Sequence, residues 1–237
     1  MALLRRRQGD SGDLPPRAVE GVRLSRQARR KQVEREKLDA TPPWQTPHHG
    51  ELAETSGPFD VSHAPDDGHT RVDLGGLRVP VIEGAELRMD TDAQGEVVGI
   101  TVLRAGSQMQ LGLFAAPRAE GIWDEVRAEL VDSIREGGGN SRQAKGRFGA
   151  ELHGELASGR GKATPVRFIG VDGPRWFLRA MLVGPAATDP EAAKPLEDLM
   201  QATVVVRGRD PLPVRDPVPL HLPKDASLGD DSSPEPD

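Results

Sequence analysis

Two apolar runs on either side of an Asp-Gly-Pro turn are the most strongly patterned feature of the chain. The runs cover residues 163–171 and 175–183, and the turn is Asp172-Gly173-Pro174. Apolar runs of this length, bounded by Gly and Pro, are typical of strands, and the short turn predicts that they pair as an antiparallel hairpin. The second run also carries Trp176 and Phe177. We therefore expect this hairpin to lie at the centre of a folded domain.

Shorter segments with a period of two predict further strands on both sides of the hairpin. In residues 108–115, for example, Met109, Leu111 and Leu113 share one face. Hairpin-length connections, such as the glycine-rich turn at residues 158–162, favour a mainly antiparallel sheet. In chain order, the remaining expected strands cover residues 71–82, 85–90, 96–104, 108–115, 141–148, 150–157 and 203–207.

Two segments follow the helical period instead. Residues 119–136 carry an apolar stripe that includes Trp123, opposite a charged face, and the glycines at 137–139 are typical of a helix end. A second helix is expected at residues 190–202. The fold class is therefore α+β, with a mainly antiparallel sheet covered by two helices. This arrangement is similar to the antiparallel sandwich of Mog1/PsbP-type domains.

The segments outside residues 71–210 lack such periodicity. Residues 1–70 are predicted to be a disordered charged arm and Pro-rich linker, and residues 211–237 a Pro-rich, acidic, disordered tail. The arm is divided by charge: residues 1–37 hold 11 Lys and Arg against 5 Asp and Glu, whereas residues 38–70 hold 6 acidic residues and no Lys or Arg. A single domain over residues 71–210 is therefore expected.

Composition excludes several classes of function. The chain has no cysteine, which excludes disulfides, thiolate nucleophiles and thiolate metal sites. The start, MALLRRR, lacks the apolar run of a secretory signal, and no run approaches the roughly 20 apolar residues of a membrane span. A cytoplasmic protein is expected.

No motif predicts a cofactor, a metal or a catalytic centre. The segment GRGKAT at residues 159–164 has the wrong glycine spacing for a phosphate-binding loop, and a strand rather than a helix follows it. The histidines do not occur at metal-ligand spacing with a carboxylate. We therefore name no catalytic residue, although distant residues can still assemble into a site.

The candidate binding residues lie near turns. A Trp beside an Arg is typical of interface hot spots, and charged residues at a helix entry can receive a ligand. The alternative is structural, with a tight turn that leads into a core strand. The candidates are Asp172, Arg175, Trp176 and Arg179 in the central hairpin, and Arg118 and Glu120, as an ion pair or a ligand site, before the first helix.

The arm offers a second kind of surface. Its two basic clusters can attract nucleic acid or another anionic surface. Aromatic residues suited to base stacking are missing before Trp44, so a solvated arm, or one that folds back on the acidic segment, stays open. The basic residues are Arg5, Arg6, Arg7, Arg29, Arg30 and Lys31.

Four segments together resemble an uncharacterised actinobacterial family of unknown function. They are RVDLGGLRVP (71–80), FAAPRAEGIWDEVRAELV (114–131), RFIGVDGPRWFLRAMLVGPAA (167–187) and VVVRGRDPLPVRDPVPLHLP (204–223). The resemblance covers about residues 71–223 and implies no activity, cofactor or catalytic residue.

Three functions compete. The leading prediction is a non-enzymatic domain that binds a protein partner of unknown identity. The alternative is a nucleic-acid-associated protein that uses the basic arm. The third is an enzyme with a dispersed site built from Asp172, Arg118 or His153.

Overall fold

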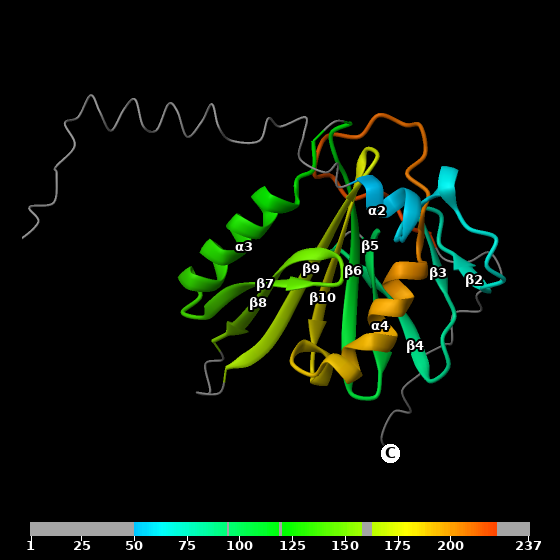
Figure 1. Cartoon of the computed structure of the whole chain (residues 1–237). Coiled ribbons are helices and arrows are strands. Elements are labelled where there is room, and N and C mark those ends of the chain that lie inside the picture. Colours follow the sequence, from blue (N-terminus) through cyan, green and yellow to red (C-terminus); the bar gives the residue numbers. More distant parts are fainter. Residues whose placement is uncertain (1–49, 94, 119, 158–162, 222–237) are drawn as a thin grey trace, which may run out of the picture. The chain divides into compact units, whose positions relative to one another are not determined.

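Strands of the described part of the chain form two β-sheets, one of seven strands and one of four (Figure 1). The computed structural model describes residues 50–93, 95–118, 120–157 and 163–221. The expected hairpin turn at 158–162 and the basic arm lie outside these ranges. Three α-helices accompany the sheets within them.

The large sheet confirms the mainly antiparallel prediction. Every neighbouring pair in it is antiparallel, in the order β4-β5-β6-β10-β9-β8-β7. The central hairpin pairs Trp176 with Gly173 and Val183 with Val166. Its strands are β4 (Ala85–Thr91), β5 (Val97–Arg104), β6 (Ser107–Ala115), β7 (Asn140–Gly146), β8 (Gly149–Leu156), β9 (Thr164–Gly173) and β10 (Trp176–Val183).

The small sheet contains the one parallel pair among the described strands. Its order is β1-β11-β3-β2, and β1 runs parallel to β11. The strands are β1 (Phe59–Asp60), β2 (Arg71–Asp73), β3 (Leu77–Pro80) and β11 (Val204–Val205). The expected strand at 71–82 is therefore two short strands, which pair with each other as a hairpin.

Both faces of the large sheet carry a hydrophobic core. The sequence of β10 is largely apolar because its alternate side chains enter the two cores. Trp176 and Leu178 on one face join the larger cluster, which also includes residues of the small sheet and of α4 (Pro190–Ala202). Phe177 on the other face joins the smaller cluster beneath α3 (Trp123–Glu136). The two predicted helices are thus confirmed, one for each face, as Figure 1 shows.

The predicted start of the domain at residue 71 is wrong. Helix α2 (Gly50–Thr55) and β1 lie inside the expected linker, and Ala53 is fully buried in the larger cluster. Phe59 pairs with Val204, and Asp60 accepts a hydrogen bond from the Trp176 indole N–H at 2.9 Å. Elements of six and two residues are too short to show a period in the sequence.

The predicted end at residue 210 is also too early. Residues 215–218 run beside β6 beyond the point where β5 stops pairing with it. The amide of Val218 donates to the carbonyl of Leu113 at 2.9 Å, and the side chains of Val218 and Leu220 are buried. Prolines alternate with the residues that make these bonds, so a Pro-rich composition here marks an edge segment rather than disorder.

Candidate functional site

Helix α3 covers only half of its face of the large sheet. It packs on β7, β8 and β9, and no described helix packs on the same face of β4, β5 and β6. Side chains from β6 and β10 reach this uncovered area beside the helix. The area is therefore a surface on which the sheet itself can contact another molecule.

A row of aromatic rings leads from beneath α3 to this area. The ring of Trp123 stacks on that of Phe177 with centroids 5.9 Å apart, and Phe177 lies 6.2 Å from Phe114. The guanidinium of Arg179 ends the row, 5.1 Å above the half-buried ring of Phe114. The predicted role of Trp123 as a core residue is confirmed, since its side chain is buried.

Arg179 borders a cavity of about 230 Å³ at the end of this row. It makes no hydrogen bond and no ion pair with any residue that the structure describes. Burial alone lowers the pKa of the guanidinium from its usual value. A half-buried guanidinium without a carboxylate offers up to five donors in a planar fork, which fits a carboxylate or phosphate. The other residues that line the cavity are Val98, Gly99, Gln110, Leu111, Gly112, Phe114 and Pro217.

Two glycines account for the hollow shape. Gly112 is the register partner of Arg179 on β6, and Gly99 on β5 is the register partner of Asp90 on β4. A Cβ at Gly112 would lie 2.9 Å from the Phe114 ring, and a Cβ at Gly99 would lie 2.9 Å from the carbonyl oxygen of Leu111. Glycine inside a strand often marks a place where another group approaches the backbone closely.

The carboxylate of Asp90, opposite Gly99, already has partners. Asp90 accepts hydrogen bonds from the Thr101 hydroxyl at 2.9 Å and from the Gln110 amide at 2.9 Å. Asp90 is therefore already hydrogen-bonded beside Gly99, and Arg179 is the charged residue among those that line the cavity.

Two of the predicted binding residues are structural. Trp176 is fully buried on the opposite face of the sheet, so it cannot anchor a partner. Asp172 is buried and caps α3: its carboxylate accepts from the backbone N–H of Ile122 at 2.8 Å and of Trp123 at 3.2 Å. A carboxylate at the N-terminus of a helix is favoured by the unpaired N–H groups there.

The other predicted residues do not gather into one site. Arg175 occupies the left-handed region with φ 66° in the hairpin turn, and its carbonyl accepts from the Ala116 N–H at 3.0 Å. Arg118 and Glu120 are both exposed, and of the two alternatives given for them, the ion pair is not formed between these described residues. Among the candidates, Arg179 lines the cavity described above. The basic residues Arg5, Arg6, Arg7, Arg29, Arg30 and Lys31 lie outside the described residues, so the nucleic-acid prediction stays a prediction.

A buried ionic cluster lies on the α4 side of the sheet and was missed from the sequence. Arg167 on β9 donates to Glu151 on β8 through Nε at 2.6 Å and through a terminal nitrogen at 2.9 Å. It also reaches Glu197 of α4 at 2.6 Å. Desolvation lowers the pKa of Arg167, but the hydrogen bond and charge of Glu151, with Glu197, outweigh it and raise the pKa overall.

His153 lies beside this cluster and is partly exposed to solvent. Its Nε2 lies 3.4 Å from Glu151, and its Nδ1 lies 3.4 Å from the guanidinium of Arg142. Desolvation lowers the pKa of His153, and the charges of Arg142 and Arg167 add to this, against the raising effect of Glu151. Burial and the two neighbouring arginines together therefore favour the neutral form of the imidazole.

The lowered pKa of His153 predicts a loss of stability in acid. A histidine whose pKa is lower in the folded state than in the unfolded state binds its proton preferentially when unfolded. Its contribution is therefore present above the unfolded pKa near 6.5 and is lost as the pH falls below that value. We expect urea midpoints between pH 7.5 and about 5 to fall less steeply for H153Q than for the wild type. Equal slopes for both proteins would contradict this.

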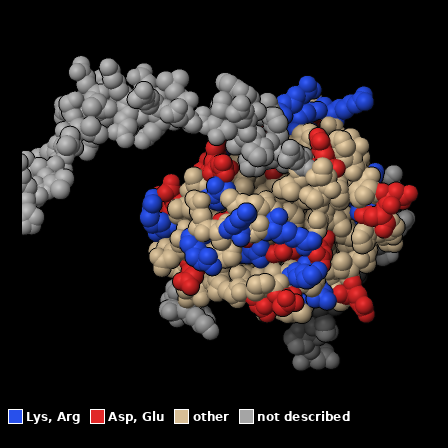
Figure 2. All heavy atoms as spheres, viewed as in Figure 1, with Lys and Arg blue, Asp and Glu red and all other residues tan. Residues whose placement is uncertain are grey.

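The face of the molecule that Figure 2 shows carries Lys and Arg side chains interleaved with Asp and Glu. Exposed pairs of this kind include Arg147 with Asp198 and Lys194 with Asp198. Within the described residues, no group of three His, Asp or Glu side chains is placed to hold a metal ion. None of the helices in these ranges is long and apolar enough to cross a membrane.

Comparisons with known proteins bear on family and fold. No curated protein matches the chain. Among solved structures, the solution structure of cyanobacterial PsbP (CyanoP) from Synechocystis sp. PCC 6803 is similar, with 11% identity and a TM-score of 0.35 over 58% of this chain and 92% of that chain. A family model described as "Protein of unknown function (DUF3710)" matches residues 57–228. Because this match spans more than half of the chain, the protein belongs to that family of unknown function.

Proposed function

We propose that the chain is a cytoplasmic, non-enzymatic domain that binds a protein partner, and that Arg179 receives an acidic side chain of that partner. The observation that carries the proposal is the half-buried guanidinium of Arg179, which has no hydrogen-bond or ion-pair partner among the described residues and borders a cavity. Burying such a group without a carboxylate lowers stability. A residue that costs stability in the free protein is often kept for function.

The size of the cavity supports a side chain as the ligand. A volume of about 230 Å³ is below the range of roughly 300–1,000 Å³ that is usual for small-molecule pockets. It is large enough for one carboxylate with its methylene stem. The uncovered sheet around it supplies the wider surface that a protein partner requires.

The surroundings of Arg179 favour an acidic residue flanked by apolar ones. Phe114, Met181 and Val183 are partly buried on the same face of the sheet and pack against the smaller core cluster. Their exposed parts can pack against apolar side chains of a partner. These contacts would exclude water and so strengthen the pair between Arg179 and the partner's carboxylate. An Arg-carboxylate pair can be bidentate, which also fixes orientation.

A pair of peptides tests the proposal. We expect acetyl-Leu-Glu-Leu-amide to shift the amide signals of β6 and β10 in NMR titrations of the full chain, and the Gln peptide to bind about 10-fold more weakly or less. R179Q should remove this difference. R88Q is the matched control, because Arg88 lies on the same face of the sheet, is exposed and pairs with Glu86. Equal binding of both peptides, or equal loss in R88Q, would contradict the proposal.

Replacing Arg179 by methionine separates binding from stability. Met keeps an unbranched apolar stem and removes the unpaired charge, although the contact with the Phe114 ring is also lost. We expect R179M to raise the free energy of unfolding by about 0.5–1.5 kcal/mol in urea titrations, because desolvation of the charge outweighs a cation–π contact of about 0.5–1 kcal/mol. The same variant should not distinguish the two peptides. A clear loss of stability would indicate that Arg179 is structural.

A further inference from the structure

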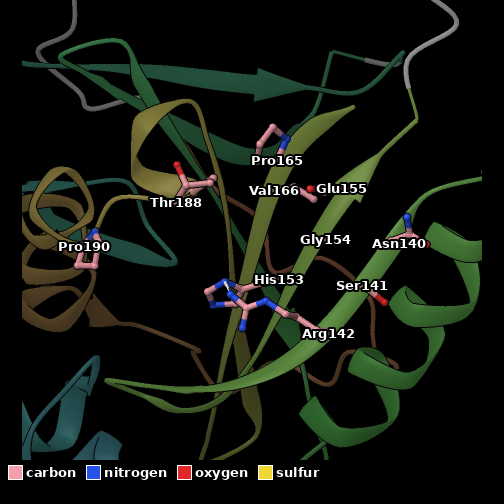
Figure 3. Close-up of a pocket in the computed structure, with 11 residues that line it drawn as sticks. Asn140, Ser141, Arg142, His153, Gly154, Glu155, Pro165, Val166, Thr188 and Pro190 are labelled. Carbon is pink, nitrogen blue, oxygen red and sulfur yellow. Dashed lines mark hydrogen bonds between the residues drawn. The ribbon is translucent and has the colours of Figure 1, made fainter. Parts of the chain in front are cut away.

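A second cavity lies on the opposite side of the large sheet, between the strands and the start of α4. It has a volume of about 460 Å³, within the range usual for small ligands. Its strand side comes from β7, β8 and β9, and its other side from Ala187, Thr188 and Pro190. Figure 3 shows Arg142 and His153 on the strands and Thr188 and Pro190 across from them.

Strand register places two opposite charges on the strand side. Arg142 pairs with His153, and Asn140 pairs with Glu155. Residues opposite each other in an antiparallel pair, and residues two apart on one strand, share a face. Arg142 and Glu155 are therefore diagonal neighbours on the same face of the sheet, and both are exposed.

These two charges are not neutralised by other described residues. A terminal nitrogen of Arg142 lies 3.4 Å from Nδ1 of the His153 imidazole, and Arg142 makes no ion pair within the described ranges. Glu155 likewise has no ion pair there. By contrast, Arg167, the register partner of His153 on β9, is bound by Glu151 and Glu197, so it is not available to a ligand.

The pair of charges selects among small ligands. A simple carboxylate at Arg142 would be repelled by Glu155, and a simple amine at Glu155 would be repelled by Arg142. A molecule with both groups satisfies both residues. Pro165, Ala187 and Pro190 add apolar surface around them, and the exposed Thr188 hydroxyl is a further hydrogen-bond donor.

We propose that this cavity binds a small zwitterion, namely a free α-amino acid with an aliphatic side chain. Arg142 holds the α-carboxylate, Glu155 holds the α-ammonium group, and the prolines contact the side chain. The site is distinct from the Arg179 cavity, which lies on the other face of the sheet and receives a protein side chain.

Valine and its two half-molecules test the charge requirement. In NMR titrations of the full chain, L-valine is expected to shift the amide signals of residues 140–142, 153–155 and 187–188. Isovalerate, which lacks the amine, and isobutylamine, which lacks the carboxylate, should each bind about 10-fold more weakly or less, because each loses one charge-assisted contact. If isovalerate bound as tightly as valine, the proposal that the ligand must be a zwitterion would be overturned.

Four variants test the residues. R142Q and E155Q are each expected to weaken valine binding about 10-fold. K145Q is the matched control, since Lys145 is exposed on the same strand but does not line the cavity. R179Q should leave valine binding unchanged, which separates this site from the proposed partner site. No saturable shift up to about 20 mM valine, or equal effects of R142Q and K145Q, would overturn the proposal.

Discussion

Replacing Arg167 by methionine is expected to lower the free energy of unfolding by about 3–5 kcal/mol, the range found when one partner of a buried ion pair is removed. Arg167 is 8% exposed and Glu151 is 1% exposed. Without the guanidinium, the carboxylates of Glu151 and Glu197 are left close together without their cation. Urea unfolding followed by circular dichroism measures the loss.

Two comparisons show whether the buried charge is the cause. R147M removes an exposed arginine that pairs with Asp198 on α4, and it should cost less than about 1 kcal/mol. The double variant R167M/E151M should recover part of the loss, because it removes one of the two unpaired carboxylates. The loss in R167M should also be larger at pH 8 than at pH 5, since protonation relieves carboxylate repulsion. A loss below about 1 kcal/mol at both pH values would contradict the expectation.

The regular part of the fold was predictable because its signals are local. Seven strands of the large sheet and helices α3 and α4 each contain enough residues to repeat a period of two or of 3.6. The glycines after α3 were read correctly: the amide of Gly137 donates to the carbonyl of Ser133, and Gly138 has φ 76°. Each of these features depends on neighbours in the sequence.

The predictions that failed concern residues whose partners lie far away in the chain. Asp172 caps a helix that begins about 50 residues earlier, and Asp60 pairs with a tryptophan 116 residues later. The same holds for the boundaries, since α2, β1 and residues 215–218 are ordered by contacts with the sheet rather than by their own pattern. Single-sequence patterns carry no record of such contacts.

For a related reason, the sequence predicted one residue of the candidate site, Arg179, but not the cavity beside it. Arg179 was among the expected binding residues because it lies near Trp176, yet Trp176 and Arg179 occupy opposite faces of the sheet. The signal that does identify the cavity is the pair of strand glycines, Gly99 and Gly112, which leave space beside Arg179. Their adjacency becomes visible only when the register of β4, β5, β6 and β10 is known.

Trp176 gives the second large effect. Its side chain is fully buried in the larger cluster, so W176A is expected to lower the free energy of unfolding by about 3–5 kcal/mol, as large aromatic deletions in cores do.

Removing the segment before residue 71, which contacts Trp176, is expected to reproduce part of this loss. A chain that begins at residue 71 lacks Ala53, Phe59 and Asp60, and it should be less stable than the full chain in the same urea titration. Equal stability would show that α2 and β1 add nothing to the core.

A double-mutant cycle isolates the hydrogen bond that joins the two segments. D60A leaves the buried indole N–H without its acceptor at 2.9 Å, which should cost about 1–3 kcal/mol. W176F removes the donor and part of the ring. Because both changes delete the same bond, D60A should cost little more in the W176F background, and the coupling energy should be about 1 kcal/mol or larger. Additive effects would mean that the Asp60 side chain acts through its hydrogen bonds from Ser62 rather than through Trp176.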